Sequence, residues 1–405
     1  MTAERTMQAW YHCENVYPFV PQEVLDRAES VRASLPNKYC DPQIAADLFH
    51  ECLDEHLLCD ELGINIVSIE HHSGINSLYG ASTMILGIMA RQTKNVRILS
   101  LGTLITVRPD PVRIAEEYAT ADVLSRGRLE IGFVKSGDSE MVSGNVNPVG
   151  YVSRFWEAID VIKLALTSHD GPVSFEGKYY THRHINIWPG PYQRPHPRFW
   201  AATGDPETSA ELGRRGYINA LVLRGPEASK RAFDTYRKAR QEAGLPAPGT
   251  DKFAYAALCY VGDTDEEGVA VGSKLLWFLN TSLKQSPQMS KFLPGRNSPE
   301  LAPNIWRTTG ARGRPADQLI GITAERAIER GILVAGNPDT VYWQIMDIYD
   351  QVGGFAHFIF IGRSGFLTHQ EANKGIRLMA KEVLPRLPGA TVTPETASAV
   401  PAAAQ

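Results

Sequence analysis

Short apolar runs recur along the chain and predict a repeating series of β-strands. Eight of these runs, rich in Val, Ile and aromatic residues, have the length and β-branched content expected of strands. The predicted strands cover residues 7–13, 64–70, 96–107, 128–134, 198–203, 217–223, 252–261 and 355–361.

Between these runs, apolar residues recur every three or four positions, which predicts amphipathic helices. The predicted helices cover about 42–62, 81–93, 110–125, 152–166, 206–215, 227–243, 264–280 and 341–352. Eight strands alternating with eight helices predict an α/β fold, a closed (β/α)8 TIM barrel made by a single domain. An open doubly wound sheet is the alternative.

Three segments are longer than the connections of a minimal barrel. Residues 14–41 and 281–325 each follow a predicted strand, so we expect them at the C-terminal face, where barrel enzymes place their active sites. We interpret both as lid insertions, and 170–197 as a Pro-rich connection. The domain should span 1–389, and the tail 390–405, poor in large apolar residues, should be disordered.

The composition favours a protein that acts on small molecules. The chain has 405 residues, 43% hydrophobic and 21% charged, with a formal net charge of -4. Such a charge offers no attraction to nucleic acid or to an anionic membrane. No apolar run is long enough to span a bilayer, so we expect a cytoplasmic protein. The five cysteines include no C-x-x-C pair, which favours reduced thiols.

The segment SIEHHSG, residues 68–74, ends the second predicted strand with a glutamate and two adjacent histidines. Side chains alternate along a strand, so Glu70 and His72 should share one side and His71 should take the other. Adjacent histidines are therefore poor co-ligands for a metal. Two hypotheses remain: a buried structural pair, or one histidine that projects into the barrel mouth as an acid, a base or a hydrogen-bond donor.

A second histidine pattern, HRH at residues 182–184 with His196 downstream, matches a metal site better. No carboxylate or cysteine accompanies it at a known spacing. We therefore expect no metal, and a metal-dependent barrel hydrolase is an alternative function only.

The junction TGDPETS, residues 203–209, predicts a turn at Gly204 and a helix capped by Asp205. The N–H groups and positive dipole end of such a helix favour a phosphate, although the Asp205 carboxylate would repel one. Lys135 and Ser136 end the fourth strand and would reach the same phosphate. The alternatives are an ordinary capped helix and a solvated lysine. No dinucleotide fingerprint or P-loop is present.

Residues at the expected barrel mouth suggest the kind of substrate. Trp10, Tyr11 and His12 end the first strand, and Glu70 ends the second. Together with the lid aromatics they favour a small, mostly apolar or aromatic organic molecule. These lid aromatics are Tyr17, Phe19, Phe292 and Trp306.

Over most of its length, about 42–280 and 331–388, the chain resembles the bacterial luciferase-like flavin-dependent monooxygenases, and within them the limonene or alkanal monooxygenase-like subgroup. The resemblance is carried by the order and spacing of several segments: LGINIVSIEHHS, PDPVRIAEEYATADVLSRGRLEIGF, NVNPVGYVSRFWEAIDVI, WPGPYQRPHPRFWAATGDPETSAELGRRGY and GFAHFIFIGRSGFLTHQEA. It implies a TIM barrel in which reduced FMN, delivered by a separate flavin reductase, reacts with O2. The resulting flavin C4a-hydroperoxide oxygenates an organic substrate, and a homodimer is the commonest assembly.

The resemblance also implies roles for particular residues. The first histidine of the E-H-H segment, His71, would lie beside the flavin and act in catalysis. A non-proline cis peptide would strain the third strand at Leu104 and Ile105, with Thr103 near the flavin ring. The phosphate would contact a further set of residues at the ends of strands four and five: Lys135, Ser136, Gly204, Asp205 and Thr208.

The chain also departs from the family pattern. Lys135 and Ser136 stand where relatives commonly have Arg-Gly, and Asp205 replaces a serine. An ammonium lacks the bidentate fork of a guanidinium, which would weaken phosphate binding. The segment GDSEM replaces a more glycine-rich one. Two alternatives remain on the same barrel: a deazaflavin-dependent oxidoreductase, and a flavin-binding protein without turnover.

Overall fold

Eight parallel strands close into a barrel whose last strand pairs with its first. The computed structural model describes residues 5–147, 150–282, 319–391 and 393. Each barrel strand pairs in parallel with the next, and the ring confirms the predicted (β/α)8 barrel. The barrel strands are β2 (Gln8–Cys13), β3 (Asn65–Ser68), β4 (Ile98–Thr103), β5 (Leu129–Val134), β8 (Phe199–Ala202), β9 (Ile218–Val222), β10 (Phe253–Val261) and β12 (His357–Arg363).

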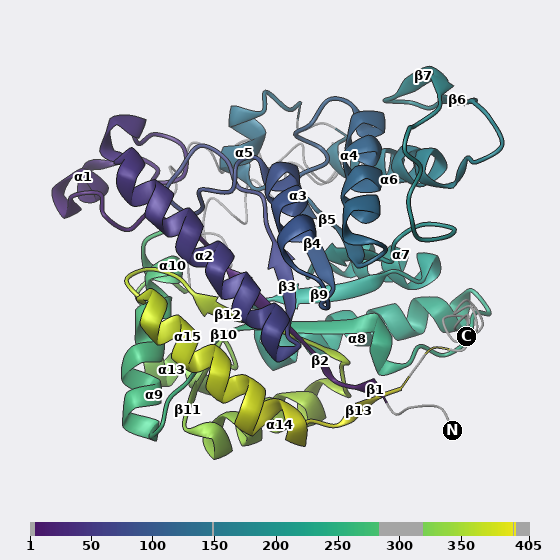
Figure 1. The fold of residues 1–405 in the computed structure, drawn as a ribbon. Helices are drawn as coiled ribbons and strands as arrows, with labels where there is room; N and C mark the ends of the chain where they lie inside the picture. The colour runs from purple at the N-terminus through teal and green to yellow at the C-terminus, as the bar shows by residue number, and fades with distance from the viewer. Residues whose placement is uncertain (1–4, 148–149, 283–318, 392, 394–405) are drawn as a thin grey trace, which may run out of the picture.

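Long helices surround the strands (Figure 1). Asp41, Asp110 and Asp205 each cap a helix that begins with proline, and these three helices begin and end within one residue of their predicted bounds. No helix among the described residues is long and apolar enough to cross a membrane. The long helices are α2 (Pro42–Leu62), α3 (Ser82–Gln92), α4 (Pro111–Ser125), α6 (Tyr151–Thr167), α7 (Pro206–Arg215), α8 (Gly225–Glu242), α14 (Pro338–Val352) and α15 (His369–Leu378).

Several elements differ from the prediction. The helix predicted over 264–280 is divided into α9 (Asp265–Gly272), η3 (Ser273–Leu276) and α10 (Trp277–Asn280). The four-residue strand β11 (Leu333–Gly336) was too short to be recognised; it pairs with the C-terminal half of β10. The 170–197 connection forms an antiparallel hairpin. The remaining elements are β1 (Arg5–Thr6), α1 (Gln22–Arg27), η1 (Asn37–Tyr39), α5 (Asp138–Ser143), β6 (Val173–Glu176), β7 (Thr181–Ile185), η2 (Thr250–Lys252), α13 (Ala324–Glu329), η6 (Met379–Val383), η7 (Leu384–Arg386) and β13 (Gly389–Ala390).

The structure describes one of the two predicted insertions, a small part of the other, and the first residues of the predicted disordered tail. Residues 14–41 contain α1 and η1 and pack around a small apolar cluster that includes Tyr17 and Val31. Most of 281–325 lies outside the described residues. The predicted disordered tail began too early, because β13 pairs with β1 near the N-terminus (Figure 1). The Thr393 N–H also donates to Asp251 Oδ1 at 2.8 Å. Residues 394–405 also lie outside the described part.

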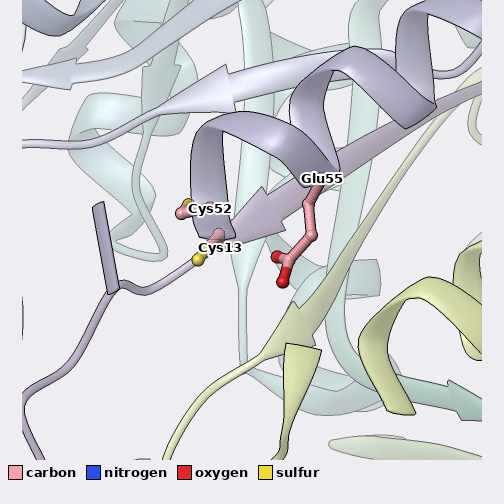
Figure 2. Close-up of side chains that lie close together, drawn as sticks. All are labelled: Cys13, Cys52 and Glu55. Atoms are coloured by element: carbon pink, nitrogen blue, oxygen red, sulfur yellow. The ribbon is translucent and has the colours of Figure 1, made fainter. Parts of the chain in front are cut away.

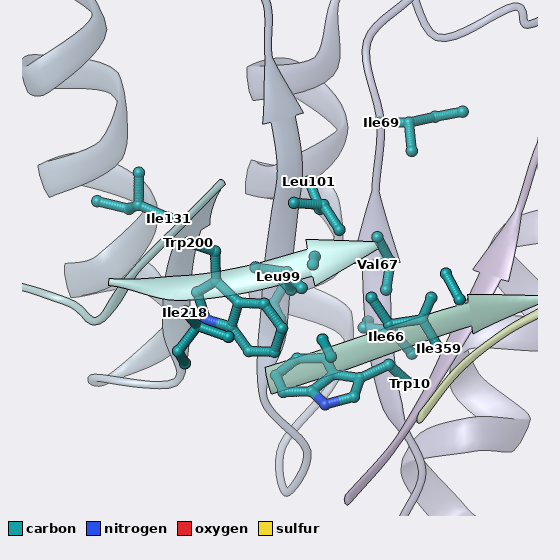
Figure 3. Close-up of a cluster of buried hydrophobic side chains, with 14 of the residues drawn as sticks. Trp10, Ile66, Val67, Ile69, Leu99, Leu101, Ile131, Trp200, Ile218 and Ile359 are labelled. Carbon is teal, nitrogen blue, oxygen red and sulfur yellow. The ribbon is translucent and has the colours of Figure 1, made fainter. Parts of the chain in front are cut away.

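Large side chains fill the barrel interior on the side of the N-terminal ends of the strands (Figure 3). Trp10 and Trp200 meet edge to face, with ring centroids 5.2 Å apart. The Trp10 indole N–H donates to Nδ1 of the buried His357 at 3.2 Å. Such aromatic packing with a hydrogen-bonded indole adds stability beyond the area buried, so the N-terminal half of the barrel is a packed core.

A buried carboxylate, Glu130, holds this layer together. It accepts a hydrogen bond from the Trp200 indole at 2.5 Å and forms ion pairs with Arg97 and Arg198. Burial alone would raise the pKa of Glu130, but the charges of Arg198, Arg97 and His357 lower it to about 2. Glu130 is therefore an ionised anchor at neutral pH.

This anchor generates a stability prediction. Glu130→Gln leaves both arginines without their carboxylate, so the free energy of unfolding should fall by about 3 kcal/mol at neutral pH. A depressed folded-state pKa means that this stability is present above the unfolded value, about 4.3, and is lost as the pH falls toward 2. Urea unfolding at several pH values should show the difference between variant and wild type narrowing over that window.

The matched control is Glu176→Gln, which removes an exposed ion pair with Arg183 on the hairpin. It should change the free energy of unfolding by no more than about 0.5 kcal/mol. A Glu130→Gln effect that does not depend on pH would contradict the electrostatic explanation.

Candidate active site

A cavity of about 910 Å³ opens at the C-terminal ends of the barrel strands. One part of its wall is apolar and includes Leu101, Leu104 and Phe278, whereas another part is polar. Because the strands run in parallel and the barrel is closed, side chains that are distant in sequence meet at this mouth. The cavity is the candidate active site.

His71 projects into the cavity from the loop after β3, which ends two residues earlier than predicted. Its Nδ1 lies 2.7 Å from Oε1 of Glu140 on α5. The other oxygen of Glu140 accepts the Gly137 N–H at 2.6 Å. In the sequence, the GDSEM segment stood out only as a departure from the family, and the role of Glu140 was not predicted. The signal was available: an acidic residue follows a barrel strand at the active face.

Glu140 is ionised although it is buried. Burial would raise its pKa, but the hydrogen bond and charge of His71, the charge of Arg32 and the Gly137 N–H lower it to about 2. An ionised carboxylate only accepts hydrogen bonds, so the His71 Nδ1 carries the hydrogen of this pair. The Nε2 atom of His71 is then the ring nitrogen left for a ligand.

Glu70 and His72 form a separate pair. The distance from His72 Nε2 to Glu70 Oε1 is 2.9 Å, and the Ser82 hydroxyl donates to Glu70 Oε2 at 2.5 Å. Glu70 and His72 are in contact, but Glu70 and His71 both line the cavity, because β3 ends at Ser68 and strand alternation does not extend to these residues. The hydrogen bond to Glu70 raises the pKa of His72, against the opposing effect of burial.

Four of the five residues expected at the phosphate come together, all but Ser136, and the cation among them is already paired. Lys135 Nζ donates to Asp205 Oδ2 at 2.5 Å and to the Thr208 hydroxyl at 2.8 Å. Asp205 Oδ1 accepts the Thr208 N–H at 2.8 Å, as a helix cap. Burial would raise the pKa of Asp205, but Lys135 and these hydrogen bonds lower it well below its usual range. Lys135 and Gly204 line the cavity.

A second cation at this end of the cavity, Arg224, was not recognised in the sequence. A Cβ atom at Gly204 would lie 3.0 Å from the Arg224 Nε, so the glycine makes room for the guanidinium. Arg224 follows β9, and nothing in its short surrounding sequence marks it as a site residue. Tertiary structure alone brings it to Gly204.

Three predicted site residues are buried away from the cavity. Tyr11 follows an inward-facing Trp10 and precedes an inward-facing His12, so alternation turns it outward, where its hydroxyl donates to Glu55 at 2.5 Å. Its assignment to the substrate pocket was therefore wrong. Ser136 is fully buried with its Oγ 2.7 Å from the Tyr151 hydroxyl, and Thr103 lies beside Ser100.

Leu104 lines the cavity. The non-proline cis peptide of this strand, however, lies between Leu101 and Gly102 and not at Leu104 and Ile105. A Cβ atom at residue 102 would lie 2.5 Å from the Gly132 carbonyl oxygen on the neighbouring strand. Close packing of β4 against β5 therefore requires a glycine at this position.

Two thiols and a carboxylate lie close together outside the barrel (Figure 2). Ligand atoms of Cys13, Cys52 and Glu55 are within 4.8 Å of one another. Glu55 already accepts hydrogen bonds from Tyr11, Arg363 and His369, and burial raises the pKa of the Cys52 thiol well above its usual value. A protonated Cys52 thiol and a carboxylate paired with arginine are poor metal ligands. The cluster joins α2 to β2, β12 and α15.

The histidines of the 182–196 segment do not converge on such a group within the described residues. His182 and His184 lie on the β6–β7 hairpin, and His196 stacks on Phe199 at 4.1 Å between ring centroids. Its Nδ1 lies 2.7 Å from the Pro197 carbonyl oxygen.

Residues 37–354 match the sequence profile of the family described as Luciferase-like monooxygenase. Because the match covers more than half of the chain, the protein belongs to this family. Limonene 1,2-monooxygenase of Rhodococcus erythropolis is 25% identical over 346 residues, which are 83% of this chain and 80% of that protein. The oxygenase component of the flavin-dependent trigonelline monooxygenase of Acinetobacter baylyi is 25% identical over 250 residues, 59% and 67% of the two chains.

Solved structures share the fold. The oxygenating constituent of 3,6-diketocamphane monooxygenase from Pseudomonas putida, in complex with FMN, has a TM-score of 0.67 and 18% identity over 95% of this chain and 99% of that one. The coenzyme F420-dependent tetrahydromethanopterin reductase from Methanopyrus kandleri has a TM-score of 0.63 and 18% identity over 95% and 99%. At this identity the likeness concerns the fold, which accommodates either type of cofactor.

The Glu70–His72 pair generates a pH prediction. A folded-state pKa of His72 raised above the unfolded value, about 6.5, adds stability that is complete below that pH and is lost as the pH rises through the folded value. His72→Gln should therefore destabilise the protein most at acidic pH, with the difference vanishing on the alkaline side. Urea unfolding across this range measures it, with the exposed His184→Gln as control. A difference that grows with pH would contradict the assignment.

Proposed function

We propose that the protein is the oxygenase component of a two-component flavin-dependent monooxygenase. In this proposal, reduced FMN comes from a separate flavin reductase and O2 is the co-substrate. The observation that carries the proposal is the His71–Glu140 pair at the mouth of a luciferase-family barrel, beside a cavity large enough for a flavin and a small molecule. One relative is named as an oxygenase component, which supports a separate reductase as the source of reduced flavin. The family resemblance supports a homodimer.

The residues of the cavity fit a flavin. Leu101 and Leu104 offer an apolar wall for a ring system. Lys135, supported by the Thr208 hydroxyl, and Arg224 offer donors for a phosphate. Thr103, Ser136 and Asp205 act in this proposal behind that surface, as supports. Reduced flavin, when bound, supplies the electrons with which O2 is activated.

His71 is the proposed catalytic residue, and Glu140 is its positioning residue. The ionised carboxylate holds the Nδ1 hydrogen, so the ring keeps one orientation and Nε2 faces the reacting atoms. There His71 donates or accepts a proton. The apolar part of the wall would limit contact between water and a bound flavin ring, which favours oxygenation over wasteful oxidation of the flavin.

The second candidate function is a deazaflavin-dependent oxidoreductase. It is supported by the F420-dependent enzyme that shares the fold at a TM-score close to that of the FMN complex. Dialysis of the purified protein against FMN and against F420, followed by absorption spectra, separates the two. Retention of F420 alone would favour the second candidate.

The first functional prediction concerns His71. His71→Ala should bind FMN with unchanged affinity, while the yield of oxygenated product per reduced flavin consumed falls by about 100-fold or more, because proton transfer is lost. Limonene, trigonelline and a long-chain alkanal are suitable first substrates, and hydrogen peroxide release measures the uncoupled reaction. Glu140→Gln should lower the yield by a smaller factor. Normal product yield in His71→Ala would refute the assignment.

A second prediction concerns the phosphate. Asp205→Asn keeps a good helix cap but removes the carboxylate that competes for Lys135. The Kd for FMN should fall by about tenfold, equivalent to about 1.4 kcal/mol. Riboflavin has no phosphate, so its Kd should not change. Equal effects on the two ligands, or weaker FMN binding, would show that the pair does not act on the phosphate.

A further inference from the structure

The polar part of the cavity wall contains a carboxylate that the proposed flavin chemistry does not use. Glu14 follows β2 and is 3% exposed, and it lines the cavity together with His12 and His71. Its Oε2 atom is buried and has no hydrogen-bond partner among the described residues. Its Oε1 atom is 3.3 Å from His12 Nε2, an ion-pair contact, and that nitrogen also lacks a hydrogen-bond partner.

The charges around Glu14 keep it ionised. Burial would raise its pKa, but the nearby charges of His12, His71 and Arg32 lower it below the ordinary value. Arg32 itself donates from Nε to the Ser282 carbonyl at 2.8 Å. A buried carboxylate without a full set of donors carries an unrecovered desolvation cost. A ligand that brings a donor to this point would remove that cost.

Two other glutamates that line the cavity, Glu70 and Glu140, differ from Glu14 in their hydrogen bonds. Glu70 has hydrogen bonds to both oxygens, from His72 and Ser82, and Glu140 has them from His71 and Gly137. Glu14 is therefore the carboxylate of this wall that is available to a ligand. It shares the cavity with apolar side chains of β4 and of the α10 region, such as Leu101 and Phe278.

We propose that His12 and Glu14 form the specificity site for the substrate, and that this substrate combines an apolar body with one hydrogen-bond donor, a hydroxyl or a protonated nitrogen. The inference rests on the proposed function, because it identifies the kind of molecule that is oxygenated. It narrows the sequence-based expectation of a mostly apolar substrate. The body packs on the apolar wall and the donor reaches the Glu14 carboxylate, which fixes the face presented to His71.

The experiment measures binding without turnover, on the full chain with oxidised FMN added. Three probes of one size are compared by calorimetry: cyclohexanol as a neutral donor, cyclohexylammonium as a cationic donor, and cyclohexanone as an acceptor without a donor. At least one donor probe should bind about tenfold more tightly than cyclohexanone, since hydrogen bonds to charged groups are the stronger ones. Which donor binds more tightly distinguishes a neutral from a cationic substrate.

Glu14→Gln should remove that preference, by weakening the donor probe about tenfold while cyclohexanone binds as well or better. The control is Glu227→Gln, at the rim of the cavity, where the side chain is 90% exposed and paired with Arg231. It should leave the preference intact. If Glu14→Gln fails to fold, as judged by circular dichroism, His12→Gln is used and should also reduce the preference.

Equal binding of all three probes to the wild type, or a preference that survives in the folded Glu14→Gln or His12→Gln protein, would overturn this inference. The monooxygenase proposal would stand in that case, because the His71 experiment reads product yield and not probe affinity. Conversely, a donor preference in a protein that oxygenates no substrate would support the binding site at His12 and Glu14 but refute the proposed reaction.

Discussion

The pairing of β12 with β2 closes the barrel, and every feature of the candidate site depends on that closure. Backbone hydrogen bonds between these strands bring His12 into register with Ile361, although almost the whole chain separates them. A closed parallel sheet places all eight strand ends on one rim. It also forces alternate side chains inward and outward, so that His12 faces the cavity while Tyr11 anchors α2 through Glu55.

Buried carboxylates recur in this protein, and their partners decide what each one does. Glu130 is held by two arginines and an indole at the bottom of the barrel, which makes it structural. Glu55 plays a similar part outside the barrel, with Arg363 and His369. At the mouth, Glu140 is bound to a histidine that faces the cavity, and Glu14 retains an unpartnered oxygen. A buried carboxylate with a full set of partners thus anchors the fold, one bound to a histidine positions that histidine, and one with an unpartnered oxygen is left to bind a ligand.

The α7 N-terminus illustrates how one substitution changes an expected site. A capping aspartate stabilises the helix, yet its second oxygen also neutralises Lys135. Phosphate binding by a helix N-terminus relies on free N–H groups and positive charge. Here Asp205 accepts one of these N–H groups and neutralises part of the positive charge. Arg224 lies beside Gly204 as a further positive charge.

Local sequence determined most of the fold. Apolar periodicity located all eight barrel strands, and the Asp205–Pro206 cap located the start of α7, because both signals act over a few residues. The same local signals identified His71, Lys135 and Asp205 as residues at strand or helix ends. They could not reveal that Glu140 orients His71, that Asp205 pairs with Lys135, or that Glu14 is left without a partner. Those contacts join segments far apart in the chain, so only closure of the barrel, which sets distances and burial, decided them.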